Sequence, residues 1–167
     1  MVSSEKITPD RIPGKECVWD YPRPPKLEKA SKRLRVFVEG EMIADTTEGY
    51  RVLETSHPPT YYFPPKDVQL KYFKKTSKNT FCEWKGAASY YTIQVKEKIL
   101  ENKAWYYPDP NKEFLEIKDY ISFYPSFMDK CLVDEEVVQS QEGDFYGGWI
   151  TSNITGPFKG GVGTYGW

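Results

Sequence analysis

Hydrophobic and polar residues alternate with a period of two over many short stretches of this chain, which is the pattern of strands with one buried face. The clearest stretch is R-L-R-V-F-V-E at residues 33–39. Gly40-Glu41 then predicts a two-residue hairpin loop, and M-I-A-D-T predicts the returning strand. A third strand, G-Y-R-V-L-E-T-S, runs into His57-Pro58-Pro59, where the prolines lack backbone N–H groups and force the chain out of the sheet.

The rest of the pattern predicts more strands and little helix. We predict strands at residues 68–74, 80–95, 99–107, 120–125 and 131–138, a polar turn at 75–79, a turn at 96–98 and a hairpin loop at Asp134-Glu135. Residues 111–120 have the spacing of one amphipathic helix. The sequence therefore predicts a mainly β, compact, single-domain antiparallel fold with at most one or two short helices.

The two ends of the chain differ from this middle region, which we assign to residues 33–139. Residues 1–32 form a proline-rich arm in which the prolines argue against both helix and strand, and its basic run at 26–35 is interpreted as a solvated linker rather than a phosphate-binding patch. Residues 140–167 form a glycine-rich tail, and the aromatic residues within it indicate that it packs on a surface.

Composition narrows the classes of function. Aromatic residues make up 16% of the chain, which favours β structure. The formal net charge of −1 provides no global field for nucleic acid or an anionic membrane. No apolar stretch approaches the ~20 residues that cross a bilayer, and no secretory pattern opens the chain, so we expect a soluble, cytoplasmic protein. Three cysteines without a C-x-x-C pair argue against disulfides and zinc.

Reactive and aromatic side chains are densest at residues 80–91, T-F-C-E-W-K-G-A-A-S-Y-Y. Residues 54–64, E-T-S-H-P-P-T-Y-Y-F-P, contain the single histidine, and residues 104–110 read A-W-Y-Y-P-D-P. We expect these three stretches to meet in one pocket for a small ligand. The residues expected to bind the ligand are Arg23, Tyr61, Gly86, Tyr90, Trp105 and Tyr107.

Four residues are candidates for chemistry in that pocket. Lys85 would hold an anionic group, His57 would transfer a proton and Glu54 would orient the imidazole. Cys82, as a nucleophile, is the weaker variant, because strand alternation places the thiol and the amine on opposite faces unless the chain bends at Gly86. Three of the four have a structural alternative: Lys85 as a surface cation paired with a glutamate, His57 as a hydrogen-bonded structural residue, and Cys82, like the aromatic residues, as core filling.

The sequence points to no particular cofactor. G-x-x-x-x-G-K-[ST] and G-x-G-x-x-G after a strand are both absent, which argues against the common phosphate-binding loops. One histidine and scattered cysteines and carboxylates form no pattern of metal ligands.

Seven motifs follow one another along the chain: W-D-Y-P-R-P-P (19–25), I-A-D-T (43–46), R-V-L-E-T-S-H-P-P (51–59), C-E-W-K-G (82–86), A-W-Y-Y-P-D-P (104–110), G-D-F-Y-G-G-W-I-T (143–151) and G-P-F-K-G (156–160). In this order they resemble the longer form of the DUF427 family, also labelled NTP_transf_9 or nucleotidyltransferase-like. The resemblance implies a β fold similar to the tent-like Mss4 group, without its zinc, and implies that arm and tail are ordered against the core. It implies no established reaction.

Three functions follow as hypotheses. The first is a pocket for a small anionic or flat ligand, with or without catalysis, covered by Arg23 and the tail. The second is a non-catalytic adaptor whose aromatic tail docks a protein partner. The third, nucleic-acid binding, has stacking aromatics in its favour and the balanced charge against it.

Overall fold

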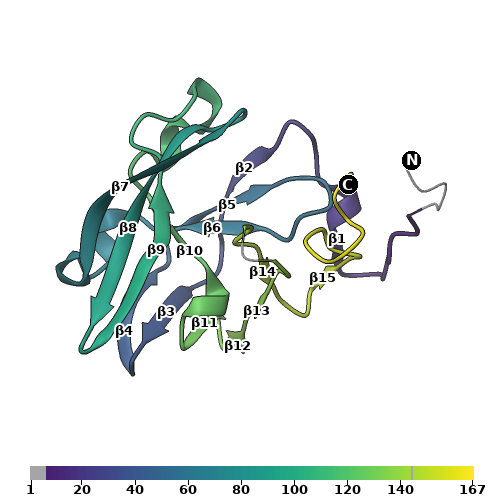
Figure 1. Ribbon diagram of the computed structural model, residues 1–167. Helices are drawn as coiled ribbons and strands as arrows, with labels where there is room; N and C mark the ends of the chain where they lie inside the picture. The colour runs from purple at the N-terminus through teal and green to yellow at the C-terminus, as the bar shows by residue number, and fades with distance from the viewer. Residues whose placement is uncertain (1–6, 144) are drawn as a thin grey trace.

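The computed structural model describes residues 7–143 and 145–167 and confirms a mainly β fold with antiparallel sheets (Figure 1). The helical segments are short 3₁₀ turns, labelled η. In chain order the elements are β1 (Glu16–Cys17), η1 (Val18–Asp20), β2 (Lys26–Lys29), β3 (Leu34–Val38), β4 (Glu41–Thr46), β5 (Tyr50–Leu53), β6 (Thr60–Tyr62), η2 (Pro65–Asp67), η3 (Leu70–Tyr72), β7 (Phe73–Cys82), β8 (Gly86–Val95), β9 (Lys98–Tyr106), η4 (Lys112–Ile117), β10 (Ile121–Phe123), η5 (Pro125–Phe127), β11 (Lys130–Val133), β12 (Glu136–Val137), β13 (Gln139–Ser140), β14 (Trp149–Ile150) and β15 (Ile154–Thr155).

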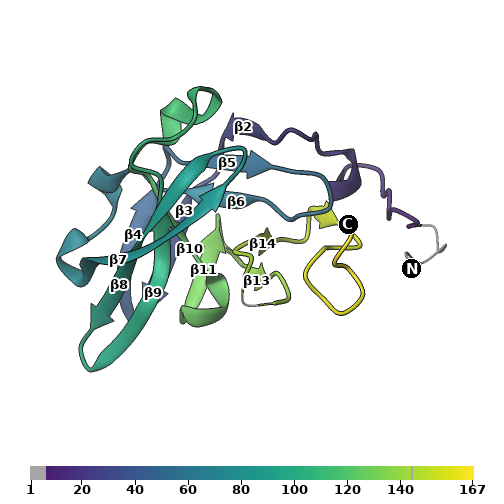
Figure 2. The same cartoon turned by 45° about the horizontal axis from the view of Figure 1, so that its top comes forward.

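Three sheets build the body of the molecule (Figures 1 and 2). The largest has the strand order β10-β9-β8-β7, the second has β12-β11-β3-β4, and the third has β2-β5-β6. Phe63 and Ile121 exchange two backbone hydrogen bonds of 2.8 Å, so the chain leaving β6 pairs with β10. This pairing sets the third sheet against the largest one and fixes the positions of the strands that surround the site.

Local sequence explains most of the strand connections. The β3–β4 turn centres on Glu39 and Gly40, both with positive φ (50° and 75°), which is the geometry of a primed hairpin turn. The turn therefore lies one residue earlier in the sequence than the predicted loop at Gly40-Glu41. The predicted hairpin at Asp134-Glu135 joins β11 to β12 as expected. The predicted helix at 111–120 is the short 3₁₀ segment η4.

The local structure of three segments was predicted wrongly. Residues 75–79 are not a polar turn but part of β7, an edge strand whose register with β8 shifts between Lys75 and Asn79. Polar residues are tolerated there because an edge strand faces solvent. Residues 70–72 form η3 rather than strand. The arm, predicted to lack strands, contains two: β1, which pairs with β15, and β2, which pairs with β5 immediately after the last proline of the run.

Strands β8 and β9 carry buried side chains on both faces. Tyr91 and Tyr106 belong to the main core, whereas the neighbouring Tyr90 and Trp105 belong to a second cluster on the opposite face. Successive side chains of a strand point to opposite faces, so adjacent aromatic residues serve two different environments. The main core also contains aliphatic residues of the second sheet and three large aromatic residues, one after β6, one in β10 and one in β14: Leu34, Val36, Val38, Ile43, Phe63, Phe123 and Trp149.

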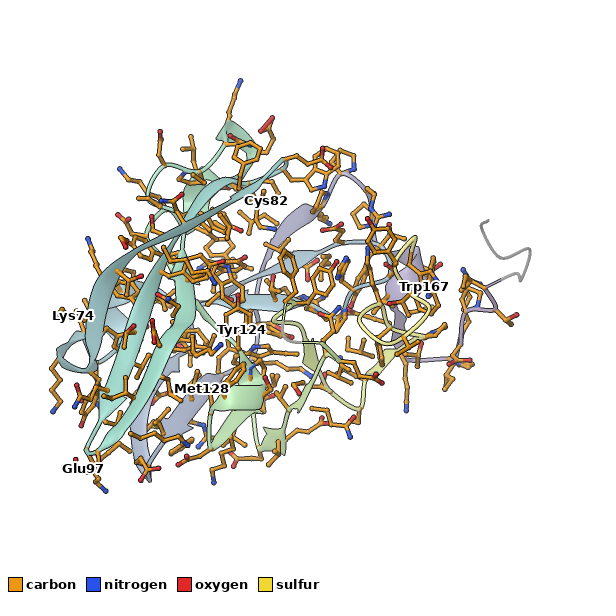
Figure 3. The ribbon with its side chains drawn as sticks, in the orientation of Figure 1. Lys74, Cys82, Glu97, Tyr124, Met128 and Trp167 are labelled. Atoms are coloured by element: carbon orange, nitrogen blue, oxygen red, sulfur yellow. The ribbon has the colours of Figure 1, made fainter. Side chains whose placement is uncertain are left out.

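The arm and the tail pack against each other at one end of the molecule (Figure 1). Strands β1 and β15 pair in parallel, the rings of Trp19 and Trp167 lie 5.4 Å apart, and the indole N–H of Trp19 donates to the Pro157 carbonyl at 2.8 Å. Figure 3 shows Trp167 at this end, with Lys74 and Glu97 at the opposite edge. Across residues 7–143 and 145–167, the helical segments are too short to cross a membrane.

Candidate ligand-binding cavity

A cavity of about 410 Å³ opens between β5–β6, the β7–β8 hairpin, β9 and the tail. All three stretches that the sequence singled out contribute to its wall. Nine aromatic side chains line it: Tyr62, Phe81, Trp84, Tyr90, Trp105, Tyr107, Tyr124, Phe145 and Tyr146. The other lining residues are Val52, Glu54, His57, Pro58, Thr60, Lys78, Thr80, Cys82, Glu83, Lys85, Gln141, Gly147 and Lys159. Its volume suits a ligand of metabolite size.

The β7–β8 hairpin turn brings the thiol and the amine into this cavity. Strand β7 ends at Cys82, β8 begins at Gly86, and residues 83–85 form the turn between them. The single strand predicted at residues 80–95 was therefore wrong: the stretch belongs to two antiparallel strands, and the turn removes the alternation that separated the thiol from the amine. Gly86 has φ of +104°, a conformation that glycine adopts without strain. Asn111 secures the turn, because its backbone N–H donates to the Lys85 carbonyl at 2.9 Å and its side-chain amide donates to the Trp84 carbonyl at 2.8 Å.

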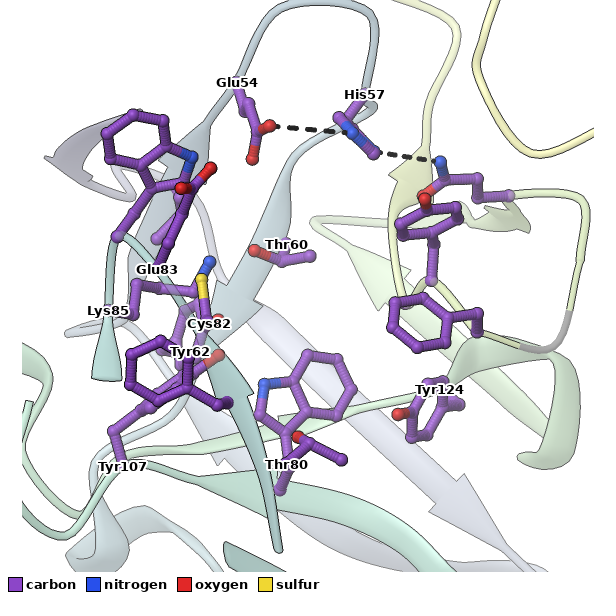
Figure 4. Close-up of a pocket in the computed structure, with 18 of the residues that line it drawn as sticks. Glu54, His57, Thr60, Tyr62, Thr80, Cys82, Glu83, Lys85, Tyr107 and Tyr124 are labelled. Carbon is purple, nitrogen blue, oxygen red and sulfur yellow. Dashed lines mark hydrogen bonds and ion pairs between the residues drawn. The ribbon is translucent and has the colours of Figure 1, made fainter. Parts of the chain in front are cut away.

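The ammonium of Lys85 lies beside Cys82 at one side of the cavity (Figure 4). Burial alone lowers the pKa of Lys85, but electrostatic interactions with Tyr62, Cys82 and Glu54 outweigh this effect and raise the pKa above its usual value. The amine is therefore protonated at neutral pH. No carboxylate oxygen of the described residues lies within 4.0 Å of it, so the alternative of a surface cation paired with Glu83 or Glu54 does not hold.

His57 and Glu54 lie together along another part of the wall (Figure 4). Burial lowers the pKa of His57 to about 4, and the positive charges of Lys159, Arg23 and Lys85 act in the same direction. The imidazole is therefore neutral at pH 7, and its Nε2 lies 3.8 Å from Glu54 Oε2, which is too far for a hydrogen bond. Glu54 is instead paired with Arg23, whose Nη2 lies 3.3 Å away.

Two residues of the tail region close the cavity around His57. Gln141 is buried, and its side-chain Nε2 lies 3.2 Å from His57 Nδ1. Tyr146 packs edge-on against the imidazole with ring centroids 4.9 Å apart. The imidazole is thus held by segments from two distant parts of the sequence.

The aromatic part of the wall is densely packed. Trp105 and Tyr124 have ring centroids 4.6 Å apart, and Trp105 meets Tyr62 edge-on at 6.3 Å. Thr80 and Tyr90 share a hydrogen bond of 2.9 Å between their hydroxyl groups. The ammonium of Lys78 lies 4.6 Å from the Tyr90 ring centroid, a cation–π contact between β7 and β8. These rings are both part of a buried cluster and the surface that a ligand would meet.

Seven of the ten residues that the sequence proposed line this one cavity: Glu54, His57, Cys82, Lys85, Tyr90, Trp105 and Tyr107. Arg23 does not line it and instead donates a hydrogen bond to Glu54, which does. Gly86 shapes the turn. Tyr61 lies elsewhere, beside a small second cavity of about 80 Å³, because the alternation of β6 directs its neighbours Thr60 and Tyr62 into the main cavity and Tyr61 to the opposite face.

A family model described as "Domain of unknown function (DUF427)", NTP_transf_9, matches residues 26–134. The chain belongs to the DUF427 family. A search of curated proteins finds no match. The DUF427 match contains the strands β2 to β11 and hence the sheet side of the cavity.

The tail side of the cavity lies outside the DUF427 match, and sequence reasoning missed most of it. Gln141, Phe145, Tyr146, Gly147 and Lys159 all line the cavity. Aromatic residues among glycines indicated a packed tail, but no local pattern marked Gln141 or Lys159. Thr60 and Tyr62 were detectable in principle, since they alternate with Tyr61 in the same short strand.

No metal site emerges from the described part of this DUF427 chain, where no three His, Cys, Asp or Glu side chains gather closely enough to hold an ion. The three cysteines are free thiols. Cys17 and Cys131 are buried, whereas Cys82 is half-buried in the cavity wall. Burial raises the pKa of Cys131, which makes that thiol unreactive at neutral pH.

Proposed function

We propose that this DUF427 protein binds a small anionic molecule with a flat ring in the 410 Å³ cavity. The observation that carries the proposal is the protonated amine of Lys85, which faces an aromatic-lined cavity and has no carboxylate of the described residues within 4.0 Å. A partly desolvated cation of this kind is stabilised by an anion, and aromatic walls favour a planar ligand body. The proposal concerns binding and assigns no reaction.

The charge of the cavity wall supports an anionic ligand. Three lysines line it, Lys78, Lys85 and Lys159, against two glutamates. Glu54 is already paired with Arg23, and Glu83 lies in the exposed part of the turn. A carboxylate beside Lys85 would complete a charge-assisted hydrogen bond, which contributes roughly 1.5–3 kcal/mol.

Matched pairs of ligands test the proposal directly. Benzoate and indole-3-acetate carry the planar ring and the charge, whereas benzamide and indole-3-acetamide keep the ring and lose the charge. Isothermal titration calorimetry should show binding of the carboxylates and at least tenfold weaker binding of the amides, since a tenfold change corresponds to about 1.4 kcal/mol. Equal affinity within each pair, or no binding of either carboxylate, would contradict the proposal.

Variants locate the binding within the chain. Lys85→Gln should weaken carboxylate binding by about tenfold to a hundredfold, as expected for a lost charge-assisted hydrogen bond. Lys74→Gln is the matched control, because Lys74 is exposed on β7 and does not line the cavity. A similar loss of affinity in both variants would indicate nonspecific charge effects and would contradict a site at Lys85.

The alternative function is an adaptor that docks a protein partner through its tail. The observation in its favour is the exposure of Val162 and Tyr165 near the end of the tail, where large apolar side chains face solvent. Limited proteolysis distinguishes the two functions. A tail that is cleaved at once from an intact core favours the adaptor, whereas a protected tail favours a covering over the ligand cavity.

A further inference from the structure

The buried side chain of Gln141 connects the tail to the imidazole of His57. Gln141 follows β13, is 3% exposed and lines the cavity. Its amide makes three contacts: Oε1 accepts from the Gly148 N–H at 3.1 Å, Nε2 donates to the Lys159 carbonyl at 2.7 Å, and Nε2 lies 3.2 Å from His57 Nδ1. All the polar atoms of this buried amide therefore have partners.

These contacts fix which end of the amide faces His57. The Gly148 N–H requires an acceptor, and the Lys159 carbonyl requires a donor. Rotating the amide by 180° would place nitrogen against the Gly148 N–H and oxygen against the Lys159 carbonyl, and both contacts would be repulsive. Two backbone groups thus determine that the amide nitrogen, a donor, points to Nδ1 of His57.

A donor at Nδ1 determines the tautomer of the imidazole. Nδ1 must accept the hydrogen bond, so the single ring proton of neutral His57 lies on Nε2. The charged groups around the ring are Glu54 from the β5–β6 loop, Arg23 from the arm, Lys85 from the hairpin turn and Lys159 from the tail. Three of these four are cations that oppose a second ring proton.

We propose that Gln141 is a positioning residue that holds His57 as the neutral Nε2–H tautomer, so that the imidazole donates a hydrogen bond to a carboxylate oxygen of the bound ligand. The inference rests on the proposed function for its ligand and deepens it, because the wall of the cavity then offers two donors, Lys85 and His57. It differs from the hypothesis drawn from the sequence, in which His57 transfers a proton. With Nδ1 engaged by Gln141 and Nε2 protonated, His57 has no free lone pair with which to act as a general base.

The single histidine of the chain makes this proposal directly measurable. In a two-bond ¹H–¹⁵N correlation spectrum of the ligand-free protein at pH 7, the protonated and bare ring nitrogens have well-separated ¹⁵N shifts. We expect a protonated Nε2 and a bare Nδ1. A proton on Nδ1 would overturn the proposal without recourse to any variant.

Variants of Gln141 test whether the glutamine is the cause. Gln141→Met keeps the length of the side chain and removes the donor, so the two tautomers of His57 should become mixed in the spectrum. Gln141→Glu replaces the donor with an acceptor and should move the proton to Nδ1. If either variant folds, as shown by its ¹H–¹⁵N backbone spectrum, and retains the wild-type tautomer, the positioning role is overturned.

Addition of benzoate separates this inference from the proposed function. Both the inference and the proposed function predict saturable binding of benzoate, in which the Nε2–H resonance shifts and Nδ1 stays unprotonated. Binding that leaves the Nε2–H resonance unmoved would overturn the donor role while the proposed function stands. Absence of binding, with the Nε2–H tautomer present in the free protein, would overturn the proposed function and the donor role but leave the effect of Gln141 on the tautomer in place.

Discussion

Gly147 lies directly against the indole of Trp105, so that a Cβ atom at residue 147 would come within 2.3 Å of the ring. Two large groups cannot occupy this space, and Gly147 therefore allows the tail region to cover the cavity. Gly147→Ala should push the segment away from Trp105 and reduce the free energy of unfolding by about 1–3 kcal/mol, as for other overpacked sites. Urea unfolding measures this change.

The matched control for that substitution is Gly166→Ala. A Cβ atom at residue 166 would meet nothing within 4 Å, and its φ is not in the left-handed region. Its free energy of unfolding should stay within about 0.5 kcal/mol of the wild type. Equal stability of both variants would show that the contact between residue 147 and Trp105 does not constrain the tail.

The depressed pKa of His57 predicts how stability depends on pH. The pKa is about 4 in the folded protein against 6.5 for the unperturbed group. Between these values the unfolded chain binds a proton that the folded protein does not, so stability is complete above pH 6.5 and is lost as pH falls toward 4. A shift of this size corresponds to roughly 3 kcal/mol.

The variant His57→Gln isolates this contribution. Urea unfolding at several pH values between 7 and 4 should show a smaller loss of stability in the variant than in the wild type, by up to roughly 3 kcal/mol. Carboxylates also titrate in this range; for example, hydrogen bonds from Arg33 lower the pKa of Asp45. They are present in both proteins and largely cancel in the difference. Parallel curves for the two proteins would refute a neutral, buried imidazole.

Trp149 should be the main anchor of the tail region. It is fully buried, packs against Tyr61 with ring centroids 5.0 Å apart, and donates its indole N–H to the Phe123 carbonyl at 3.3 Å. Trp149→Ala should cost about 3–5 kcal/mol of unfolding free energy, as for other large-to-small core substitutions. Tyr165→Ala, at a position 97% exposed, should change it by less than about 0.5 kcal/mol. Similar melting temperatures for both variants would argue against a tail that belongs to the fold.

Cys82 should be the thiol that reacts first in the native protein. Cys17 and Cys131 are buried, at 4% and 1% exposure, whereas Cys82 lines the cavity. Mass spectrometry after brief treatment with iodoacetamide should find the label on Cys82, and Cys82→Ser should abolish the fast reaction. Bound benzoate should slow labelling, since it would occupy the same cavity. Labelling of Cys131 at the same rate would contradict the burial described above.

The sequence predicted strands correctly where hydrophobic and polar side chains alternate regularly. The β3–β4 hairpin and the hairpin at Asp134-Glu135 combine such alternation with local turn signals. Prediction failed at residues 75–79, where polar side chains on an edge strand have the composition of a turn. It failed again at Tyr61, which lies in a three-residue strand. Which of its side chains face the cavity could not be predicted without knowing what packs on each face of the sheet.

The cavity was predictable in part for a related reason. The local concentration of reactive side chains in the sequence singled out His57, Cys82 and Lys85. One hairpin turn then places the thiol of Cys82 and the amine of Lys85 in the same cavity. Gln141 could not be identified in the same way, because its role depends on a contact with a residue 84 positions earlier in the chain. A buried glutamine after a two-residue strand has no sequence pattern that distinguishes it from a surface one.

The division of the cavity wall has a consequence for how such a protein can diversify. The sheet side lies within the region shared with the family, and the side that covers His57 comes from the stretch after residue 134. Substitutions or length changes in that later stretch would reshape the side of the cavity that covers His57, while the sheet side, with Lys85 and the packed aromatic rings, stays intact. Members of the family would then acquire a different ligand specificity through changes in that later stretch alone.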